Sequence, residues 1–433
     1  MNYRNLLSLL FLVLITIYLF SINTSEENSS EENTREFLSE EEYPSDMDTL
    51  EEFIQSYYLL LESNEYLKQF KFLNLDKNQF MGDKKALKPI FEKLLELRSG
   101  LRQKVTIYQI GDSHIQSGYF PGTARTALQK YFGNSGRGLV FPLRLAGTNQ
   151  PDDYKITANG SCSRINSERG ISGFALKVSE GICFNIATNN FFRGDNSFNK
   201  LSLLTSLPGM KIKIDAAAEI TKETAFKKGN YYCNSISWKK KVPEMKITLS
   251  GEPSDLYGIC LENEQPGLLY HSCGINGAGF YNLLEQQTLF EQIGLLQPDL
   301  IIISLGTNDA QGSFRNEVFT QNLQSFMNKL RQFNPDTPVL FTLPPDSNKR
   351  GKHNNDLDKV EKIIIDFAKE NQCAWWNLSE VTGGNGSVQK LRSQQMSATD
   401  LLHYTPKGYM LQGYLFYQAF IQSYKSFSEQ TSG

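Results

Sequence analysis

A serine, an aspartate and a histidine in this sequence have the neighbours and the spacing that nucleophilic chemistry requires. Ser113 stands in the string Gly111-Asp112-Ser113-His114, directly after a short apolar run. A serine hydroxyl is a weak nucleophile until a histidine removes its proton and a carboxylate orients that histidine. Asp400 and His403 lie within one turn of each other near the end of the chain. We therefore predict that Ser113 is the nucleophile of an acyl-transfer site and that Asp400 and His403 complete its triad.

Acyl transfer also needs hydrogen-bond donors for the negative oxygen that develops on the carbonyl group. Asn308 follows an apolar run and a glycine, so its side-chain amide can supply one donor. Gly277, in the string Gly-Ile-Asn-Gly-Ala, can supply a backbone N–H, and Ser113 can supply another. We expect Ser113, Gly277 and Asn308 to form the oxyanion hole.

Two further residues are candidates for contacts with substrate. His114 adjoins the nucleophile, but a side chain adjacent in sequence seldom points back at its neighbour's hydroxyl, so we expect a structural or substrate-binding role for it. Arg137 can contact an anionic substrate or form a salt bridge within its loop. The 4 histidines are scattered, and none has the spacing of a metal ligand, so we expect no metal site.

The elements around these residues alternate between strand and helix, which predicts a mainly parallel sheet covered by helices on both faces. Short apolar runs predict strands at Val105–Ile110, Leu300–Leu305 and Val339–Leu343. Helical periodicity follows each strand, at Pro121–Tyr131, Phe319–Phe333 and Leu357–Glu370. Ser113 and Asn308 therefore lie after strands, where open α/β sheets place their ligands.

The middle of the chain, residues 159–272, breaks this alternation. Short alternating runs such as Met210–Ile214, Met245–Leu249 and Tyr257–Leu261 are separated by Gly, Pro and Asn, which predicts an inserted antiparallel β module. Its aromatic residues can stack on sugar rings or can form the core of the module, and the core is the preferred interpretation. These aromatic residues are Phe191, Phe192, Tyr231, Tyr232 and Trp238.

The N-terminal region indicates export. Residues 1–24 contain an apolar run behind a basic residue, which is typical of a cleaved signal peptide or of a membrane anchor. Residues 25–49 are acidic and poor in apolar side chains, which favours a disordered linker. Residues 50–104 show helical spacing at Leu50–Leu73 and Lys85–Leu97. We expect an exported protein, in the periplasm, in the cell envelope or outside the cell, that the N-terminal segment can attach to a membrane.

Charge and cysteine content exclude some classes of function. The 44 basic and 47 acidic residues give a net charge of -3, so nothing favours binding to nucleic acid. The 6 cysteines contain no Cys-x-x-Cys string, which argues against a zinc or cluster site. In an oxidising compartment some of them can pair, whereas buried free thiols are the alternative.

Together, four short motifs resemble the SGNH (GDSL-like) hydrolase superfamily. Gly111-Asp112-Ser113-His114 resembles its nucleophile block and Gly277 its glycine block. Gly306-Thr307-Asn308-Asp309 resembles its asparagine block, and Asp400-x-x-His403 its terminal block. The four occur in the order that the superfamily requires. The resemblance implies a flavodoxin-like three-layer α/β/α sandwich that cleaves esters without a metal or cofactor.

A narrower resemblance is to bacterial peptidoglycan O-acetylesterases and related polysaccharide O-acetylesterases. Their nucleophile block is extended by a stretch similar to Phe132-Gly133-Asn134-Ser135-Gly136-Arg137-Gly138. These relatives also carry a carbohydrate-module-like β insertion, which implies an O-acetylated polysaccharide as substrate. We expect the catalytic domain in two parts, residues 105–158 and 273–428, with a β-sandwich-like module between them.

Two other functions fit the same residues. A sugar hydroxyl instead of water can intercept the acyl-enzyme, which would make the protein a glycan O-acetyltransferase. A non-catalytic glycan-binding envelope protein is the alternative from another class, although such a protein does not need the complete trio of Ser113, Asp400 and His403. The polysaccharide, the ester position and the oligomeric state do not follow from the sequence.

Overall fold

The computed structural model describes residues 47–83, 85–214 and 218–432. The predicted leader, residues 1–24, and nearly all of the predicted linker, residues 25–49, lie outside the described residues. In the described part of the chain, no helix is long and apolar enough to cross a membrane.

A six-stranded sheet forms the centre of the catalytic region, in the order β1-β19-β16-β15-β2-β14. Its strands are β1 (Met81–Gly82), β2 (Lys104–Gly111), β14 (Gly267–Gly274), β15 (Leu300–Ser304), β16 (Val339–Thr342) and β19 (Ala374–Trp376). All neighbours in this sheet are parallel except β1, which pairs antiparallel with β19 at the edge. Numbered along the chain, the parallel strands lie in the order 2-1-3-4-5, which is the flavodoxin-like order. The predicted fold class and the three predicted strands are confirmed.

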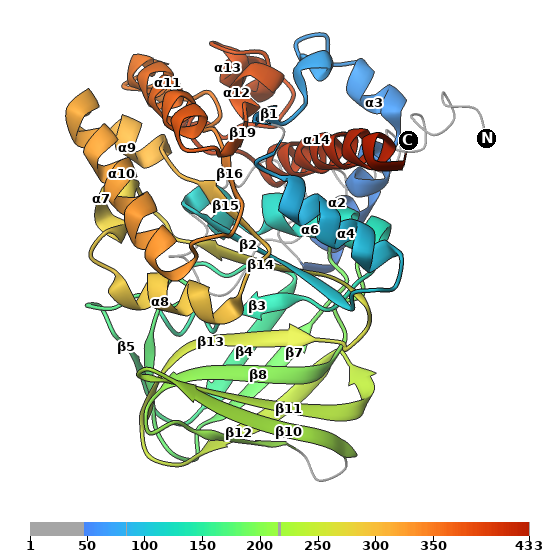
Figure 1. Cartoon of the computed structure of the whole chain (residues 1–433), viewed down its shortest axis with the longest axis vertical. Coiled ribbons are helices and arrows are strands. Elements are labelled where there is room, and N and C mark those ends of the chain that lie inside the picture. Colours follow the sequence, from blue (N-terminus) through green and yellow to red (C-terminus); the bar gives the residue numbers. More distant parts are fainter. Residues whose placement is uncertain (1–46, 84, 215–217, 433) are drawn as a thin grey trace, which may run out of the picture. The chain divides into compact units, whose positions relative to one another are not determined.

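Helices cover both faces of this sheet (Figure 1). One face packs against α2 (Met47–Leu61), α4 (Lys88–Arg98), α6 (Tyr119–Phe132) and α14 (Pro406–Ser432). The other face packs against α7 (Phe280–Leu283), α8 (Gln287–Leu296), α10 (Asn316–Phe333) and α11 (Asn355–Glu370). Successive side chains of a strand point to opposite faces, so Ile302 lies in the first core and Ile303 in the second. Three layers result.

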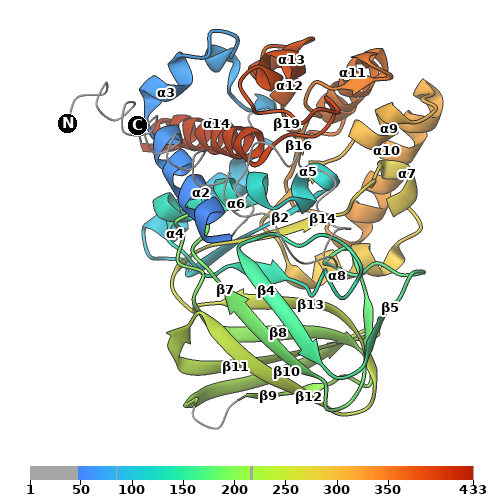
Figure 2. The ribbon, with the colours of Figure 1, turned by 180° about the vertical axis from the view of Figure 1, so that it is seen from behind.

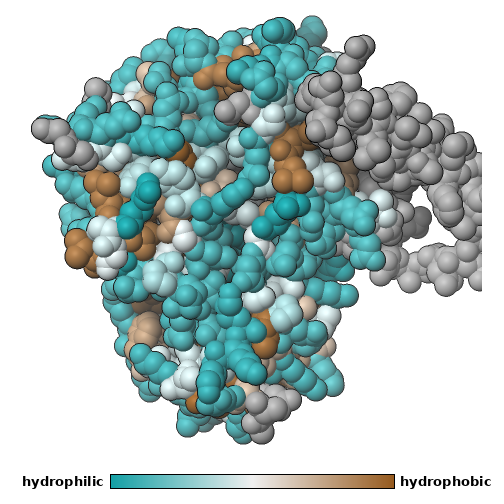
Figure 3. Space-filling view, turned by 90° about the vertical axis from the view of Figure 1, so that its right-hand side faces the viewer, coloured by the Kyte–Doolittle hydropathy of each residue, from teal (hydrophilic) through white to brown (hydrophobic). Residues whose placement is uncertain are grey.

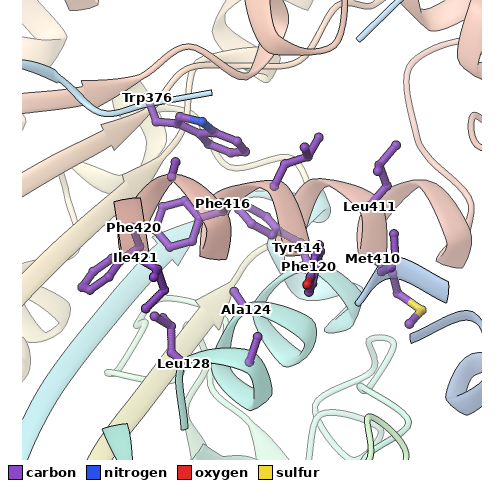
Figure 4. Close-up of a cluster of buried hydrophobic side chains, with 14 of the residues drawn as sticks. Phe120, Ala124, Leu128, Trp376, Met410, Leu411, Tyr414, Phe416, Phe420 and Ile421 are labelled. Carbon is purple, nitrogen blue, oxygen red and sulfur yellow. The ribbon is translucent and has the colours of Figure 1, made fainter. Parts of the chain in front are cut away.

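The first core is rich in aromatic side chains. Figure 4 shows α14 lying across α6, with Phe416 and Phe420 directed into the space between the helices and the sheet. Trp376 contributes its ring to this cluster from β19, and its ring centroid lies 5.4 Å from that of Phe416. Large buried rings dominate the burial of apolar surface, so α14 holds the C-terminal part of the chain against the sheet.

Shorter elements connect these layers. They are α3 (Asn64–Lys68), η1 (Leu75–Lys77), α5 (Ser113–Gln116), α9 (Thr307–Gln311), β17 (Asn348–Lys349), β18 (Lys352–His353), α12 (Leu378–Val381) and α13 (Ser387–Arg392). The predicted helical stretch at Leu50–Leu73 consists of two helices, because α2 ends at Leu61 and α3 begins at Asn64.

The inserted module is a β-sandwich of two antiparallel sheets (Figure 2). One sheet contains β3 (Gly138–Val140), β5 (Cys162–Arg164), β6 (Leu176–Val178), β8 (Phe198–Ser206), β10 (Ile220–Lys228), β11 (Tyr231–Val242) and β13 (Ser254–Glu262). The other contains β4 (Tyr154–Asn159), β7 (Cys183–Thr188), β9 (Lys211–Ile214) and β12 (Glu244–Ser250). A separate apolar core lies between the sheets.

The module has different boundaries from the predicted 159–272. Residues 267–274 form β14, which pairs in parallel with β2 inside the catalytic sheet. At the other end, β4 at residues 154–159 belongs to the module, and β3 pairs with β13 of the module. The prediction failed here because a short apolar strand has the same pattern in a parallel sheet and in a sandwich.

The aromatic residues that were considered for sugar stacking are core residues, with one exception. Phe191, Phe192, Tyr231 and Trp238 are buried, whereas Tyr232 is half-buried. Phe191 and Phe192 do not belong to the module core, because they pack in the core around α6 and α14.

All 6 cysteines are free thiols. Figure 3 shows a mostly hydrophilic face on which apolar side chains form separate small groups.

Candidate active site

Ser113 begins α5, directly after the end of β2, and its side chain remains partly accessible. Asp112 stands at the N-cap of this helix, where its Oδ1 accepts a hydrogen bond from the backbone N–H of His114 (2.9 Å). This capping bond stabilises the tight turn between strand and helix. The turn directs Ser113 Oγ toward His403, with 3.1 Å between Oγ and Nε2.

The loop before α14 brings the predicted carboxylate and imidazole together. His403 Nδ1 lies 2.7 Å from Asp400 Oδ2, and because a carboxylate only accepts, Nδ1 carries the proton and Nε2 is free to accept from Ser113. Partial burial alone would raise the pKa of Asp400. The hydrogen bonds from the imidazole and from the backbone N–H groups of Leu402 and His403 outweigh that effect and hold the pKa at about 2.

His114 has the structural role that the sequence left open beside a substrate contact. The residue is only 6 % exposed, with Nδ1 2.9 Å from Asp112 Oδ1 and Nε2 3.2 Å from the carbonyl oxygen of Leu402. Both partners accept, so both nitrogens donate. Burial would lower the pKa of His114, but the charge of Asp112 and the hydrogen bonds raise it above the ordinary value. The imidazolium therefore ties the nucleophile turn to the loop of His403.

Two loops at the ends of β14 and β15 carry the predicted oxyanion donors. Asn308 lies in α9, and its Nδ2 donates to the carbonyl oxygen of Ala278 (2.9 Å) and lies 3.4 Å from Asp112 Oδ2. Gly277 has a φ of 73°, a left-handed conformation that favours glycine, and a Cβ built there would have no atom within 4 Å. The loop at Gly277 therefore faces open space, and Asn308 is bonded both to that loop and to the turn before Ser113.

Gln116 holds the same loop from the side of the nucleophile, and the sequence analysis missed it. This side chain is 2 % exposed, and its Oε1 accepts from the backbone N–H of Asn276 (2.6 Å). Its Nε2 donates to Thr148 Oγ1 (2.6 Å) and to Asn149 Oδ1 (2.8 Å). The only sequence signal was its place one helical turn after Ser113.

Asp309 supports the loop from the opposite side. Its carboxylate accepts from the backbone N–H of Phe280, with both oxygens 3.2 Å from the nitrogen. Burial raises the pKa of Asp309 to about 6, although these backbone hydrogen bonds act in the other direction. The loop of Gly277 is thus bonded to α5 through Gln116 and to α9 through Asp309 and Asn308.

Arg137 forms a buried ion pair, which is the alternative that the sequence left open beside a substrate contact. The side chain is 3 % exposed, and its Nη2 and Nε lie 2.8 and 3.0 Å from the two carboxylate oxygens of Asp153. Arg125 from α6 donates to the same carboxylate (2.9 Å). A buried charge is stable only when it is paired. Because Asp153 pairs with both Arg137 and Arg125 of α6, this ion-pair group joins the module to the catalytic region.

In the described ranges, no group of three or more His, Cys, Asp or Glu side chains could hold a metal ion. The site instead offers a serine, a histidine bonded to a carboxylate, and a glycine loop with a neighbouring amide. These groups can activate a hydroxyl as a nucleophile and can stabilise a negatively charged oxygen by hydrogen bonds.

Comparison with known proteins agrees with this geometry. Residues 253–411 match the model of the GDSL-like lipase/acylhydrolase family. The match includes Gly277, Asn308, Asp400 and His403 and begins just before β13, the last strand of the inserted module, so it does not include Ser113. No curated protein is significantly similar to the chain in sequence.

Among solved structures, a peptidoglycan O-acetylesterase is similar in fold, with a TM-score of 0.66, 21 % identity, and coverage of 80 % of this chain and 98 % of that one. A lipase/acylhydrolase from Enterococcus faecalis has a TM-score of 0.29 and 18 % identity, and covers 35 % of this chain and 75 % of its own. An acetyl xylan esterase has a TM-score of 0.30 and 17 % identity, and covers 35 % and 81 %. Residues 253–411 thus match a GDSL-like hydrolase family and the fold is similar to that of a peptidoglycan O-acetylesterase, and both findings support a carboxylic ester hydrolase.

Proposed function

We propose that the chain hydrolyses O-acetyl esters of a polysaccharide and that Ser113 is its nucleophile. His403 Nε2 takes the hydroxyl proton while Ser113 Oγ attacks the acetyl carbonyl carbon. The tetrahedral intermediate places its negative oxygen near the N–H groups of Gly277 and Ser113 and the amide of Asn308. The ester C–O bond then breaks, and His403 gives its proton to the departing sugar oxygen.

The second half of the reaction returns the enzyme to its starting state. Water attacks the acetyl group on Ser113 and gives a proton to His403, and acetate leaves as that proton returns to Ser113 Oγ. Asp400 keeps His403 in the required tautomer and stabilises its cationic form.

One observation carries this proposal, the continuous set of contacts from Ser113 to Asp400. The distances of 3.1 Å from Ser113 Oγ to His403 Nε2 and 2.7 Å from His403 Nδ1 to Asp400 Oδ2 are those of hydrogen bonds. A low pKa keeps Asp400 ionised throughout the neutral range. A fixed carboxylate of this kind suits a histidine that must alternate between neutral and cationic forms.

Two features support a polysaccharide as the substrate. A solved structure with a similar fold over most of this chain is a peptidoglycan O-acetylesterase, and the β module is joined to the catalytic sheet beside the site, where it can bind a polymer. The apolar run in residues 1–24 supports export to a compartment that contains such polymers. We propose an exported enzyme on these grounds.

Acetate release from O-acetylated peptidoglycan and from acetylated xylan tests the proposal, with the Ser113→Ala variant as control. Release that the variant loses supports a serine esterase, and the polymer that is used identifies the substrate. Full release by the variant, or no release from either polymer by a folded wild-type protein, would refute it.

A further inference from the structure

Two arginines of the inserted module share one aromatic ring. Arg164 ends β5, and Arg169 lies in the loop that follows. Their Cζ atoms lie 5.3 and 6.0 Å from the centroid of the Phe174 ring. Phe174 itself is buried. Stacking on a fixed ring limits the motion of a guanidinium and leaves its edge N–H groups available.

Neither guanidinium has a counter-charge within the described part of the chain. Arg164 Nη1 donates to the carbonyl oxygen of Ala146 (3.0 Å), and Arg169 Nη1 to that of Gly173 (3.4 Å). No described carboxylate lies within the 4.0 Å of an ion pair with either of them. The adjacent Glu168 accepts instead from the hydroxyls of Tyr257 and Thr288.

The absence of a counter-charge destabilises the charged form of Arg169 in particular. Its side chain is half-buried. Burial lowers the pKa of Arg169 from the ordinary value, and the nearby positive charge of Arg164 lowers it further. The two positive charges near one ring repel each other, and an anion bound between them would offset this repulsion. The chain thus contains a preformed cationic group that a bound anion would stabilise.

The hydrogen-bond partners of both arginines lie near residues that contact the loop of Gly277 or its partner Gln116. Gly173 packs against Ile275, since a Cβ built at Gly173 would lie 2.5 Å from Ile275 Cγ1. Ile275 in turn donates its backbone N–H to Gly111 (3.0 Å), at the end of β2. On the other side, Ala146 precedes by two residues Thr148, the partner of Gln116. Figure 2 shows β5 at the edge of the module near α8.

We propose that Arg164 and Arg169 form an anion-binding subsite that takes a carboxylate of an acidic O-acetylated glycan. This inference rests on the proposed esterase function and narrows its substrate class to polymers with carboxylate groups. A guanidinium binds a carboxylate through two parallel hydrogen bonds. Two of them can hold one carboxylate of a glycan strand while an acetyl group of the same strand lies at Ser113.

The test compares one polymer in two charge states. O-acetylated peptidoglycan fragments with free carboxylates are compared with the same fragments after amidation of those carboxylates. The measured quantity is the ratio of kcat/KM for acetate release from the free and the amidated polymer, which cancels any general loss of active enzyme. We expect this ratio to fall about tenfold or more in the Arg164→Gln/Arg169→Gln double variant. Lys246→Gln, which removes one positive charge at an exposed position of β12, is expected to keep the wild-type ratio.

An unchanged ratio in the double variant, or an equal fall in Lys246→Gln, would overturn the subsite. Failure of the proposed function is recognised separately, because the wild-type protein would then release no acetate from either polymer. In that case the binding of the free and the amidated fragments to the Ser113→Ala variant is measured by calorimetry. A preference for the free carboxylates that the triple variant with both arginine changes loses would uphold the subsite, and no preference would refute it.

Discussion

Two aspartate–histidine pairs lie beside Ser113, and they are built for different tasks. In the turn of Asp112, both nitrogens of His114 are bonded to acceptors and the ring is buried. In the loop of Asp400, only one nitrogen of His403 is bonded to a carboxylate, and the other lies 3.1 Å from Ser113 Oγ. The comparison shows that a base is identified by a nitrogen that accepts from the nucleophile and not by its distance from the nucleophile in sequence.

The largest expected effect separates these two histidines. His403→Ala removes the group that accepts the hydroxyl proton, so we expect kcat for acetate release to fall by a factor of about a thousand or more. His114→Asn keeps a short polar side chain beside Asp112 and leaves His403 in place, so we expect a loss smaller by at least about tenfold. Steady-state kinetics on both purified variants measures the difference, and equal losses would contradict the assignment.

Asn308→Ala is expected to have the next largest effect. This change removes the amide donor and also the bond to the carbonyl oxygen of Ala278. Loss of one oxyanion donor lowers kcat by about a hundred- to a thousandfold. The corresponding control is Asn282→Ala, which removes a hydrogen bond to the carbonyl oxygen of Gly277 but no predicted donor. If both variants lost activity to the same extent, Asn308 would act only through the position of the loop.

The sequence predicted residues that carry a local signal and missed those that depend on tertiary contacts. Ser113, Asn308 and the loop of His403 could be found because each follows a strand or a recognisable motif. Gln116 could not be found, because its partners Thr148 and Asn276 are distant along the chain. For the same reason the sequence left two roles open for Arg137, since its buried partner Asp153 gave no signal in sequence.

The fold shows the same division. The alternation of apolar runs predicted the parallel sheet and its three central strands, but β14 was assigned to the module because a buried strand of either sheet has the same pattern. β19 was missed because it is only three residues long. Long, strongly periodic segments such as α10 and α11 began within a few residues of their predicted limits.

Gln116→Leu tests whether the contacts on the nucleophile side of the oxyanion loop matter for turnover. Leucine fills a similar volume but cannot bond the N–H of Asn276 or the hydroxyl of Thr148. A displaced donor affects the transition state more than the bound ester, so we expect kcat to fall about ten- to a hundredfold with KM nearly unchanged. Gln116→Glu, which keeps the acceptor, is expected to retain more activity. A rise in KM with unchanged kcat would show instead that Gln116 contributes to substrate binding.

The smallest expected effects concern stability and compare His114 with another buried histidine, His271. Burial lowers the pKa of His271 to about 3, so its stabilising contribution is present above pH 6.5 and is lost as the pH falls toward 3. The raised pKa of His114 has the opposite sign, because its contribution is present below pH 6.5 and is lost as the pH rises through the folded-state pKa.

Urea unfolding between pH 4 and pH 9 measures both contributions. As the pH falls below 6.5, the free energy of unfolding decreases, and we expect His271→Asn to reduce this decrease by about 1.4 kcal/mol per pH unit. His114→Asn is expected to flatten the dependence above pH 6.5. Identical pH profiles for the wild type and both variants would contradict the two protonation states.

The proposed mechanism requires that Ser113, activated by His403, forms a covalent intermediate. The most direct measurement is labelling with phenylmethylsulfonyl fluoride, followed by mass mapping of the modified residue and by assay of acetate release. We expect a single sulfonyl group on Ser113, loss of activity in proportion to labelling, and no labelling in the Ser113→Ala and His403→Ala variants. Full labelling of Ser113 in His403→Ala, or full activity after complete labelling, would contradict it.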